Sequence, residues 1–210
     1  MTVVPNLDAV VKAYDIRGTV PDQLDVTLAH ALGVAFAKFS DAKSIVVGHD
    51  MRPSGLALIE AFQNGLTEQG VDVINLGLAS TDMLYFASGK LNAPGAMFTA
   101  SHNPAQYNGI KCCLSGARSI GIDNGLREMK AIAQDVLNGN GPALAKTQGE
   151  VTKKNMLAEF VDHVVSFIDI DSISKLRIVA DTANGMGGLV APAVFDRLRN
   201  FEVEIMYGEL

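Results

Sequence analysis

The feature that most constrains the fold of this chain is a repeated alternation of short apolar runs with longer amphipathic segments. Leu28, Leu32 and Phe36 recur every four residues, which predicts a helix over residues 25–39. The apolar run SIVVG follows it and predicts a short buried strand. Because strands and helices alternate in this way along the chain, we expect an α/β fold. Its first part should be a layered domain in which a mostly parallel, mixed sheet lies between helices.

The other expected elements follow the same two periodicities. Ser80 or Thr81 is expected to cap one helix, and Asp123 is expected to cap another. SIVVGHDMRPSG and LRIVADTANGMGG share the order strand, aspartate, small-residue loop and helix, which favours two related α/β units. Further strands are expected over residues 71–77, 94–100, 109–116, 176–181 and 201–207, and further helices over 55–66, 80–90, 126–137, 156–167 and 189–199.

A turn-rich segment, NGNGPALAKTQGE, divides the chain. We therefore predict a first domain over residues 1–139, a linker over 140–150 and the start of a second, similar domain over 151–210. The second part has only two expected strands and two expected helices, and its last strand ends just before the final residue. We expect it to be incomplete, and so either less stable than the first domain or paired with another copy of itself.

Composition excludes several classes of protein. A net charge of −6 argues against a nucleic-acid partner or an anionic membrane surface, because both attract clustered lysine and arginine. The sequence has no apolar run long enough to cross a bilayer, and its first residues lack the pattern of a secretory signal. Cys112 and Cys113 are adjacent, which suits neither an ordinary disulfide nor a metal site, so we expect reduced, packed side chains in a cytoplasmic protein.

The loop TASHNPAQYNGIK carries the chemistry of this sequence. Ser101 and His102 are neighbours, but the chain has no G-x-S-x-G motif, and adjacent side chains on an extended segment point to opposite sides. A serine-hydrolase site is therefore not indicated. The loop is better suited to hold a phosphate group, which requires cationic or N–H partners or a metal. Lys111 at the end of the loop, and Arg17 from the segment YDIRG, are the candidate cations.

These segments together resemble one known family. TASHNPAQYNGIK closely resembles the phosphoserine loop of the α-D-phosphohexomutases, which include the phosphomannomutases and phosphoglucomutases. KAYDIRG resembles the opening motif of that family, VVGHDMRPSG its second strand and loop, and DTANGMGG the start of its second domain. The resemblance implies that a phosphoserine transfers its phosphoryl group to a hexose phosphate. The resulting hexose bisphosphate then returns its other phosphoryl group, so that phosphate moves between O1 and O6, and Mg²⁺ is the expected cofactor.

The resemblance also implies roles for individual residues. Ser101 is the phosphoryl carrier, and its phosphate is one metal ligand. His102 and Lys111 match positions with roles in proton transfer and in contact with phosphate or substrate. Arg17 matches an active-site arginine, and Tyr14 matches a neighbour that lines the cleft. Whether mannose or glucose phosphate is the substrate stays open at this point.

The rest of the metal site is expected outside this sequence. In the family that the chain resembles, the metal's carboxylates come from an aspartate-rich D-G-D-x-D-R loop, and the sequence up to Leu210 contains no such motif. The resemblance therefore implies that the remaining metal ligands lie beyond Leu210.

Other polar residues are expected to be structural. Asp50 and Arg52 should hold the loops of the first domain together rather than meet substrate, and His49 should be structural as well. His30 and His163 lie within helical patterns and are expected to be ordinary, partly exposed side chains.

Three hypotheses about function remain. The first is a phosphohexomutase, although the metal, sugar-recognition and phosphate-binding loops of the later family domains are absent. The resemblance thus implies an N-terminal fragment without mutase turnover of its own. The second is a non-catalytic α/β binding or interaction module derived from the mutase. The third is a nicotinamide- or nucleotide-binding protein based on TANGMGG, but its G-x-G-G spacing is a weak match to a dinucleotide motif, and a tight turn explains the glycines.

Overall fold

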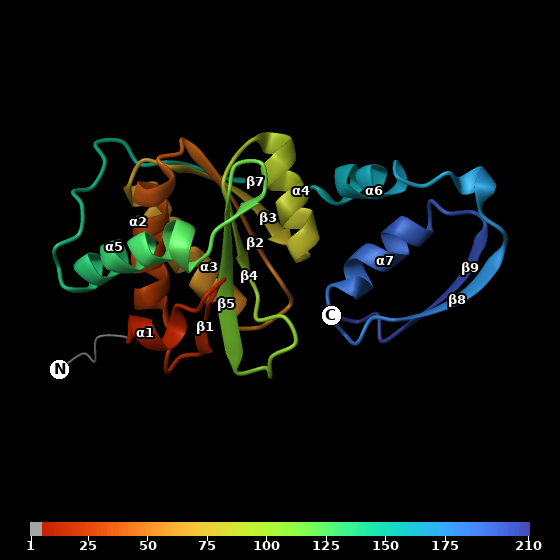
Figure 1. Ribbon diagram of the computed structural model, residues 1–210, viewed down its shortest axis with the longest axis horizontal. Helices are drawn as coiled ribbons and strands as arrows, with labels where there is room; N and C mark the ends of the chain where they lie inside the picture. Colours follow the sequence, from red (N-terminus) through yellow and green to blue (C-terminus); the bar gives the residue numbers. More distant parts are fainter. Residues whose placement is uncertain (1–5) are drawn as a thin grey trace.

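The computed structural model describes residues 6–210, and its first part is built around one mixed sheet of seven strands (Figure 1). The four strands β4, β2, β3 and β7 run parallel, whereas β5 is antiparallel to β4, β1 and β6. This arrangement confirms the predicted mixed sheet. In spatial order the strands are β1 (Ile16–Thr19), β5 (Tyr107–Leu114), β4 (Gly95–Phe98), β2 (Ser44–His49), β3 (Asp72–Leu78) and β7 (Val151–Lys153), with β6 (Arg118–Ser119) beside β5.

Helices cover both faces of this sheet, as Figure 1 shows, because side chains alternate in direction along each strand. In β2, Ile45 and Val47 point to one face, where they join a core with α1 (Leu7–Val10), α2 (Val26–Ser40), α3 (Gly55–Glu68) and α5 (Arg127–Leu137). Val46 points to the opposite face and packs with α4 (Thr81–Leu91) and with α6 (Leu157–Val165). Within the described chain, no helix has the length and apolarity needed to cross a bilayer.

Two helix starts test the predicted caps. The Ser80 hydroxyl accepts the Met83 amide at 3.1 Å, which confirms Ser80 as the cap of α4. The prediction for Asp123 is wrong. The chain enters α5 through a π-helical turn, Ile122–Leu126, in which Asn124 Oδ1 accepts the Gly121 amide at 2.5 Å. Asp123 instead pairs with Arg127 at 3.2 Å on the exposed surface. Because the backbone is non-helical at Asn124 and Gly125, α5 has its N-cap position at Leu126, and Asp123 lies too early in the chain to cap it.

The segment after α5 returns to the first domain. The Ala145 and Gly149 amides donate to the carbonyls of Glu68 and Thr67, each at 2.9 Å, so the predicted linker runs along the end of α3. Val151–Lys153 then forms β7, in parallel register with β3. The predicted start of the second domain at Val151 stays a prediction. We propose a limit after Lys153, because the backbone of β7 belongs to the first sheet.

The last part of the chain forms a second, smaller unit. Its strands β8 (Leu176–Asp181) and β9 (Phe201–Met206) are parallel neighbours, and α7 (Gly187–Phe195) connects them. A single 3₁₀ turn, Ile170–Ser172, precedes β8. In the connection after β8, Ala183 and Asn184 adopt left-handed backbone angles, and a Cβ on Gly188 would lie 2.2 Å from the Gly208 carbonyl oxygen. The glycines of TANGMGG are thus explained by a tight strand-to-helix turn.

Candidate active site

The TASHNPAQYNGIK loop leaves β4 after Phe98 and returns as β5 at Tyr107. Ser101 is exposed and has a left-handed backbone, with φ at 54°. The Ser101 hydroxyl oxygen lies 3.3 Å from Nδ1 of His102, which is also exposed. The structure therefore brings the predicted phosphoryl carrier and the predicted proton-transfer residue within one hydrogen bond of each other.

The two predicted cations meet beside this loop. The Arg17 guanidinium and Lys111 Nζ both bind the carboxylate of Asp15, the latter at 3.4 Å. Arg17 Nη1 also donates to Asn103 Oδ1 at 2.7 Å, which ties β1 to the loop of Ser101. The side chains of Arg17 and Lys111 are 25% and 28% exposed, so both stay accessible to an incoming anion.

Asp15 is a site residue that the sequence reasoning missed. Ile16 pairs with Ile110 in the antiparallel ladder, so the next position along sets Asp15 opposite Lys111. Opposite charges at such cross-strand positions attract each other. The aspartate was visible in KAYDIRG two residues before Arg17, but only the register of β1 with β5 shows that it bridges both cations.

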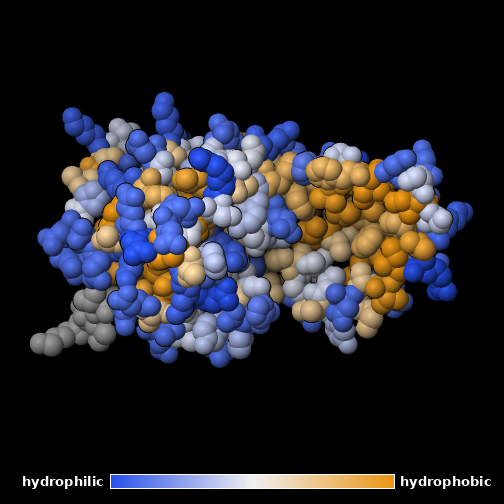
Figure 2. Space-filling view, viewed as in Figure 1, coloured by the Kyte–Doolittle hydropathy of each residue, from blue (hydrophilic) through white to orange (hydrophobic). Residues whose placement is uncertain are grey.

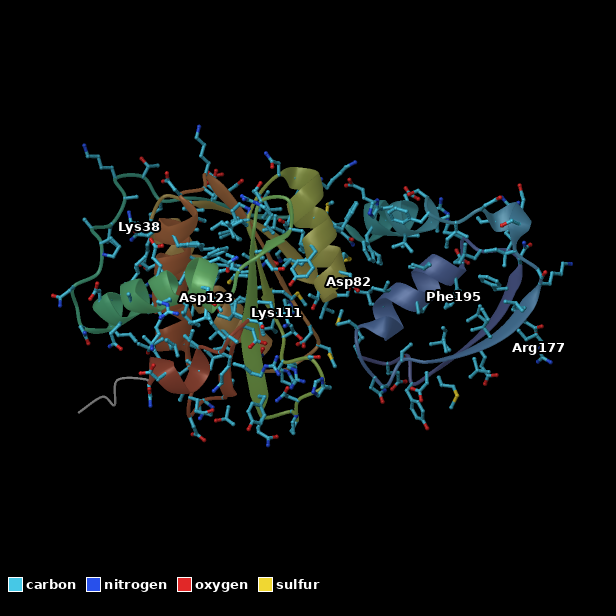
Figure 3. The ribbon with its side chains drawn as sticks, in the orientation of Figure 1. Lys38, Asp82, Lys111, Asp123, Arg177 and Phe195 are labelled. Carbon is cyan, nitrogen blue, oxygen red and sulfur yellow. The ribbon has the colours of Figure 1, made fainter. Side chains whose placement is uncertain are left out.

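Tyr14 is 81% exposed and lies at the mouth of a cavity of about 440 Å³ beside Lys111. The π-helical turn before α5 forms another wall of this cavity, and Tyr85 of α4 contributes to its lining. Burial, with smaller contributions from nearby cysteines and aspartates, raises the pKa of the Tyr85 phenol above its ordinary value. Ionisation of the Tyr85 phenol is therefore disfavoured at this cavity. Figure 3 shows Lys111 on β5 in the first domain, well separated from Phe195 on α7.

The residues expected to be structural have structural contacts. Asp50 and Arg52 are buried, and the Arg52 guanidinium donates four hydrogen bonds to loop carbonyls and pairs with the Asp50 carboxylate. His49 Nδ1 lies 2.8 Å from the Asp50 carbonyl oxygen. His30 pairs with Glu68 at 2.8 Å, and the His163 ring packs between two phenylalanine rings.

The adjacent cysteines are both buried and unpaired with each other. Burial raises the pKa of the Cys112 and Cys113 thiols above the ordinary value, which disfavours their thiolate forms. They are packing residues, as expected.

The side chains described here do not make a magnesium site. Over residues 6–210 there is no cluster of three or more histidine, cysteine, aspartate or glutamate side chains that could hold a metal ion. The Asp15 carboxylate binds Arg17 and Lys111, and the Asp50 carboxylate binds Thr99 and Arg52. Both carboxylates near the loop are thus already neutralised by protein groups, and a phosphate on Ser101 would supply only one ligand of the set that Mg²⁺ requires.

The last residue, Leu210, takes no part in such a site. Its aliphatic side chain has no atom that binds a metal ion, and it is 48% exposed in the short segment after β9. That segment is held to the second unit by a hydrogen bond from Asn184 Nδ2 to the Glu209 carbonyl, at 3.0 Å. The expectation that the remaining magnesium ligands lie beyond Leu210 stays a prediction.

Comparison with known proteins extends these observations. Residues 8–138 match the family model described as phosphoglucomutase/phosphomannomutase, alpha/beta/alpha domain I. The chain is 36% identical over 189 residues to a phosphomannomutase of Escherichia coli, a match that covers 90% of this chain and 41% of the relative. It is 40% identical over 181 residues to the phosphohexose mutases of Xanthomonas campestris, covering 85% of this chain and 39% of the relative. The chain therefore spans about 40% of the length of the curated relatives that it matches.

Solved structures agree with the fold. A phosphoglucomutase/phosphomannomutase family protein from Burkholderia thailandensis aligns over 95% of this chain and 44% of its own, with a TM-score of 0.79 and 28% identity. A protein described as a putative phosphomannomutase from Thermus thermophilus aligns over 100% of this chain and 47% of its own. Its TM-score is 0.81 at 22% identity, which supports the fold alone.

Proposed function

The chain belongs to the phosphoglucomutase/phosphomannomutase family, and we propose that it carries the phosphoserine of a phosphohexomutase that interconverts hexose 1-phosphate and hexose 6-phosphate. One observation carries this proposal. Arg17 and Lys111 come from distant parts of the sequence and meet at Asp15, and Arg17 is tied through Asn103 to the loop that exposes Ser101.

In the proposed reaction, Ser101 Oγ carries a phosphoryl group. A hydroxyl oxygen of the hexose phosphate bonds to phosphorus and loses its proton, while the bond from phosphorus to Ser101 Oγ breaks and the serine oxygen takes up a proton. His102, 3.3 Å from Oγ, is placed to exchange that proton. The hexose bisphosphate then returns its other phosphoryl group to Ser101 by the reverse step, which regenerates the phosphoserine.

The cations beside the loop supply the electrostatic part of this mechanism. Negative charge spreads over the oxygens of a phosphoryl group during transfer, so fixed positive charge lowers the barrier. Arg17 and Lys111 provide that charge, and Asp15 holds both side chains in place before substrate binds. The exposed ring of Tyr14 is proposed to line the substrate side of the cavity beside Lys111.

The complete activity is proposed for a longer protein. A magnesium requirement is proposed for the longer protein, because charge on the oxygens of the transferring phosphoryl group must be neutralised. The described residues lack a carboxylate set for Mg²⁺, and no step of the mechanism is assigned to the metal. We propose that the 210-residue chain alone does not turn over hexose phosphates. For the chain on its own, a non-catalytic binding or interaction module derived from the mutase therefore stays an alternative function. The cytoplasmic location likewise stays a prediction.

Phosphorylation of Ser101 tests the proposal directly. The longer protein is incubated with a hexose 1,6-bisphosphate and its intact mass is measured. We expect one added phosphoryl group in the unaltered protein, none in Ser101→Ala, and one in Ser174→Ala, which removes an exposed hydroxyl in the second unit. Equal phosphorylation of all three proteins would refute a phosphoserine at Ser101.

A further inference from the structure

The Ser101 loop turns four of its carbonyl groups toward one buried side chain, that of Arg52. Nη1 of Arg52 donates to the carbonyls of Pro104 and Tyr107, each at 2.9 Å. Nη2 donates to the carbonyls of Ser101 and Asn103, at 2.8 and 2.6 Å. The Arg52 side chain is only 7% exposed, so these bonds form largely out of water. Three of these carbonyls lie outside the strands and Tyr107 is the first residue of β5, so the guanidinium takes the place of a regular hydrogen-bonding neighbour.

The backbone of Ser101 is held on both sides of its α-carbon. Its N–H donates to the Thr99 hydroxyl oxygen at 3.0 Å, and its carbonyl accepts from Arg52. The left-handed backbone of a serine is unfavourable and persists only where surrounding bonds impose it. The Ser101 hydroxyl, by contrast, has its single described contact with His102 and is exposed. The backbone is therefore fixed while the hydroxyl is left free to react.

Asp50 closes this arrangement into a ring. Its Oδ2 accepts from the Thr99 hydroxyl at 2.6 Å, and its Oδ1 accepts from the Arg52 backbone N–H at 3.0 Å. Its carboxylate also lies 3.3 Å from Arg52 Nε, which neutralises the buried guanidinium. Each of the four residues is thus bonded to the next, from Asp50 through Thr99 and Ser101 to Arg52.

We propose that Arg52 is a positioning residue for phosphoryl transfer, acting through the backbone of Ser101 rather than on the reacting atoms. This inference rests on the function proposed above. A reacting oxygen that is displaced by about 1 Å can lose about a hundredfold in rate, so a loop without regular structure must be fixed by other means. A planar guanidinium with five donors can bind four carbonyls at once, whereas a lysine ammonium has three donors and no fork. The Arg52→Lys variant therefore keeps the charge but loses the geometry.

The first test measures loop rigidity without any reference to catalysis. Amide hydrogen exchange is followed by mass spectrometry in the 210-residue chain with Arg52→Lys, and with Arg127→Lys as a control at an exposed arginine. The Asn103 and Tyr107 amides, which donate within the loop, should exchange at least about tenfold faster in Arg52→Lys, with peptides from α2 unchanged. Unchanged loop exchange would overturn the inference.

A second variant, Thr99→Val, tests the same ring of hydrogen bonds in case Arg52→Lys unfolds the domain. Thr99→Val removes the hydroxyl that accepts the Ser101 N–H from the opposite side of the ring and nearly preserves volume. It should loosen the same peptides, and Thr99→Ser, which keeps a hydroxyl, should restore their protection. Protection of the loop in Thr99→Val would count against a ring that fixes Ser101.

The second test measures transfer itself in the longer protein. Phosphorylated enzyme is mixed with hexose phosphate, and the single-turnover rate is measured per phosphorylated molecule, a quantity that an unfolded fraction does not alter. We expect a rate about a hundredfold lower for Arg52→Lys and an unchanged rate for Arg127→Lys. Equal rates combined with a loosened loop would overturn the positioning role and leave the phosphoserine intact. Absence of phosphorylation in the unaltered protein would instead refute the proposed function, whatever the exchange experiment shows.

Discussion

The first domain and the second unit use the same kind of strand–helix connection, yet they bury their side chains very differently. Five of the six residues of β2 are buried, because helices cover both faces of the sheet. Within the described chain, no residue of β8, α7 or β9 is buried, and Figure 2 shows hydrophobic residues gathered on the surface of this unit. A parallel pair of strands needs cover on both faces to make a core, and here α7 covers only one.

The helix α6 connects the two regions, and it too has its most buried residues against the first domain. Met156 and Phe160, at the start of α6, are buried against α4 in the first domain, where the Phe160 ring lies 5.7 Å from that of Phe86. The helix that leads into the second unit is therefore anchored on the first domain by Met156 and Phe160, while it also contacts α7 of the second unit, and its Asp162 pairs with Arg197 at 2.6 Å. We infer that the first domain is the stable part of this chain and that the second unit depends on it.

The largest expected effect comes from a glycine between α2 and α3. A Cβ on Gly33 would lie 2.2 Å from the Phe62 carbonyl oxygen, so Gly33→Ala must separate the two helices. We expect the free energy of unfolding to fall by about 4 kcal/mol, measured by urea denaturation followed by circular dichroism. Gly89→Ala, where a Cβ meets nothing within 4 Å on α4, is the matched control and should not destabilise the domain. Equal unfolding curves for the two variants would show that α2 and α3 do not pack this closely.

The next effect concerns the anchor of α6. Phe160→Ala removes a ring that is only 7% exposed and should weaken docking of α6 by up to about 3 kcal/mol. The expected result is faster trypsin cleavage after the exposed Lys175, because the second unit opens more often. Phe167→Ala removes a ring that is 76% exposed and should leave the cleavage rate unchanged. If Phe160→Ala also left it unchanged, the second unit would be stable without α6 docking.

A smaller effect is expected on self-association, which stays a prediction for the second unit. Val179 is 62% exposed on the outer face of β8, and a lysine there places charge on the surface that a second copy would cover. Sedimentation velocity should show a dimer dissociation constant about tenfold higher for Val179→Lys, equivalent to about 1.4 kcal/mol. Leu56→Lys changes a side chain of equal exposure on α3 and should have no effect. A monomeric unaltered chain at all concentrations would refute self-association.

The smallest effect on the stability of the first domain is expected from Gly188→Ala, although its clash with the backbone is as close as that of Gly33→Ala. A Cβ on Gly188 would lie 2.2 Å from the Gly208 carbonyl oxygen, so Gly188→Ala should disrupt the turn before α7. If the second unit contributes little to the first domain, the free energy of unfolding of the first domain should change by less than about 0.5 kcal/mol. The same urea experiment measures it. A loss comparable to that of Gly33→Ala would show that the two regions unfold as one.

The candidate site shows where prediction from sequence reached its limit. Ser101, His102, Arg17, Lys111 and Tyr14 were all selected from the sequence, and the structure brings Ser101 beside His102 and brings both cations to one carboxylate. Their catalytic roles stay predictions. Neither the bridge from Asp15 to Lys111 nor the four carbonyls around a single guanidinium could be derived from the sequence, because these contacts join segments separated by about 50 to 100 positions.

The sequence by itself determined the local elements of this protein. Periodic apolar residues specified α2, β2 and their repeats, and a serine hydroxyl specified the start of α4, because these features depend on residues within a few positions of each other. Only the tertiary structure decided that β7 joins the first sheet, that a π turn replaces the cap predicted at Asp123, and that Asp15 lies between Arg17 and Lys111. Sheet register and buried polar contacts depend on how distant segments pack, and many sequences with the same local periodicity could pack differently.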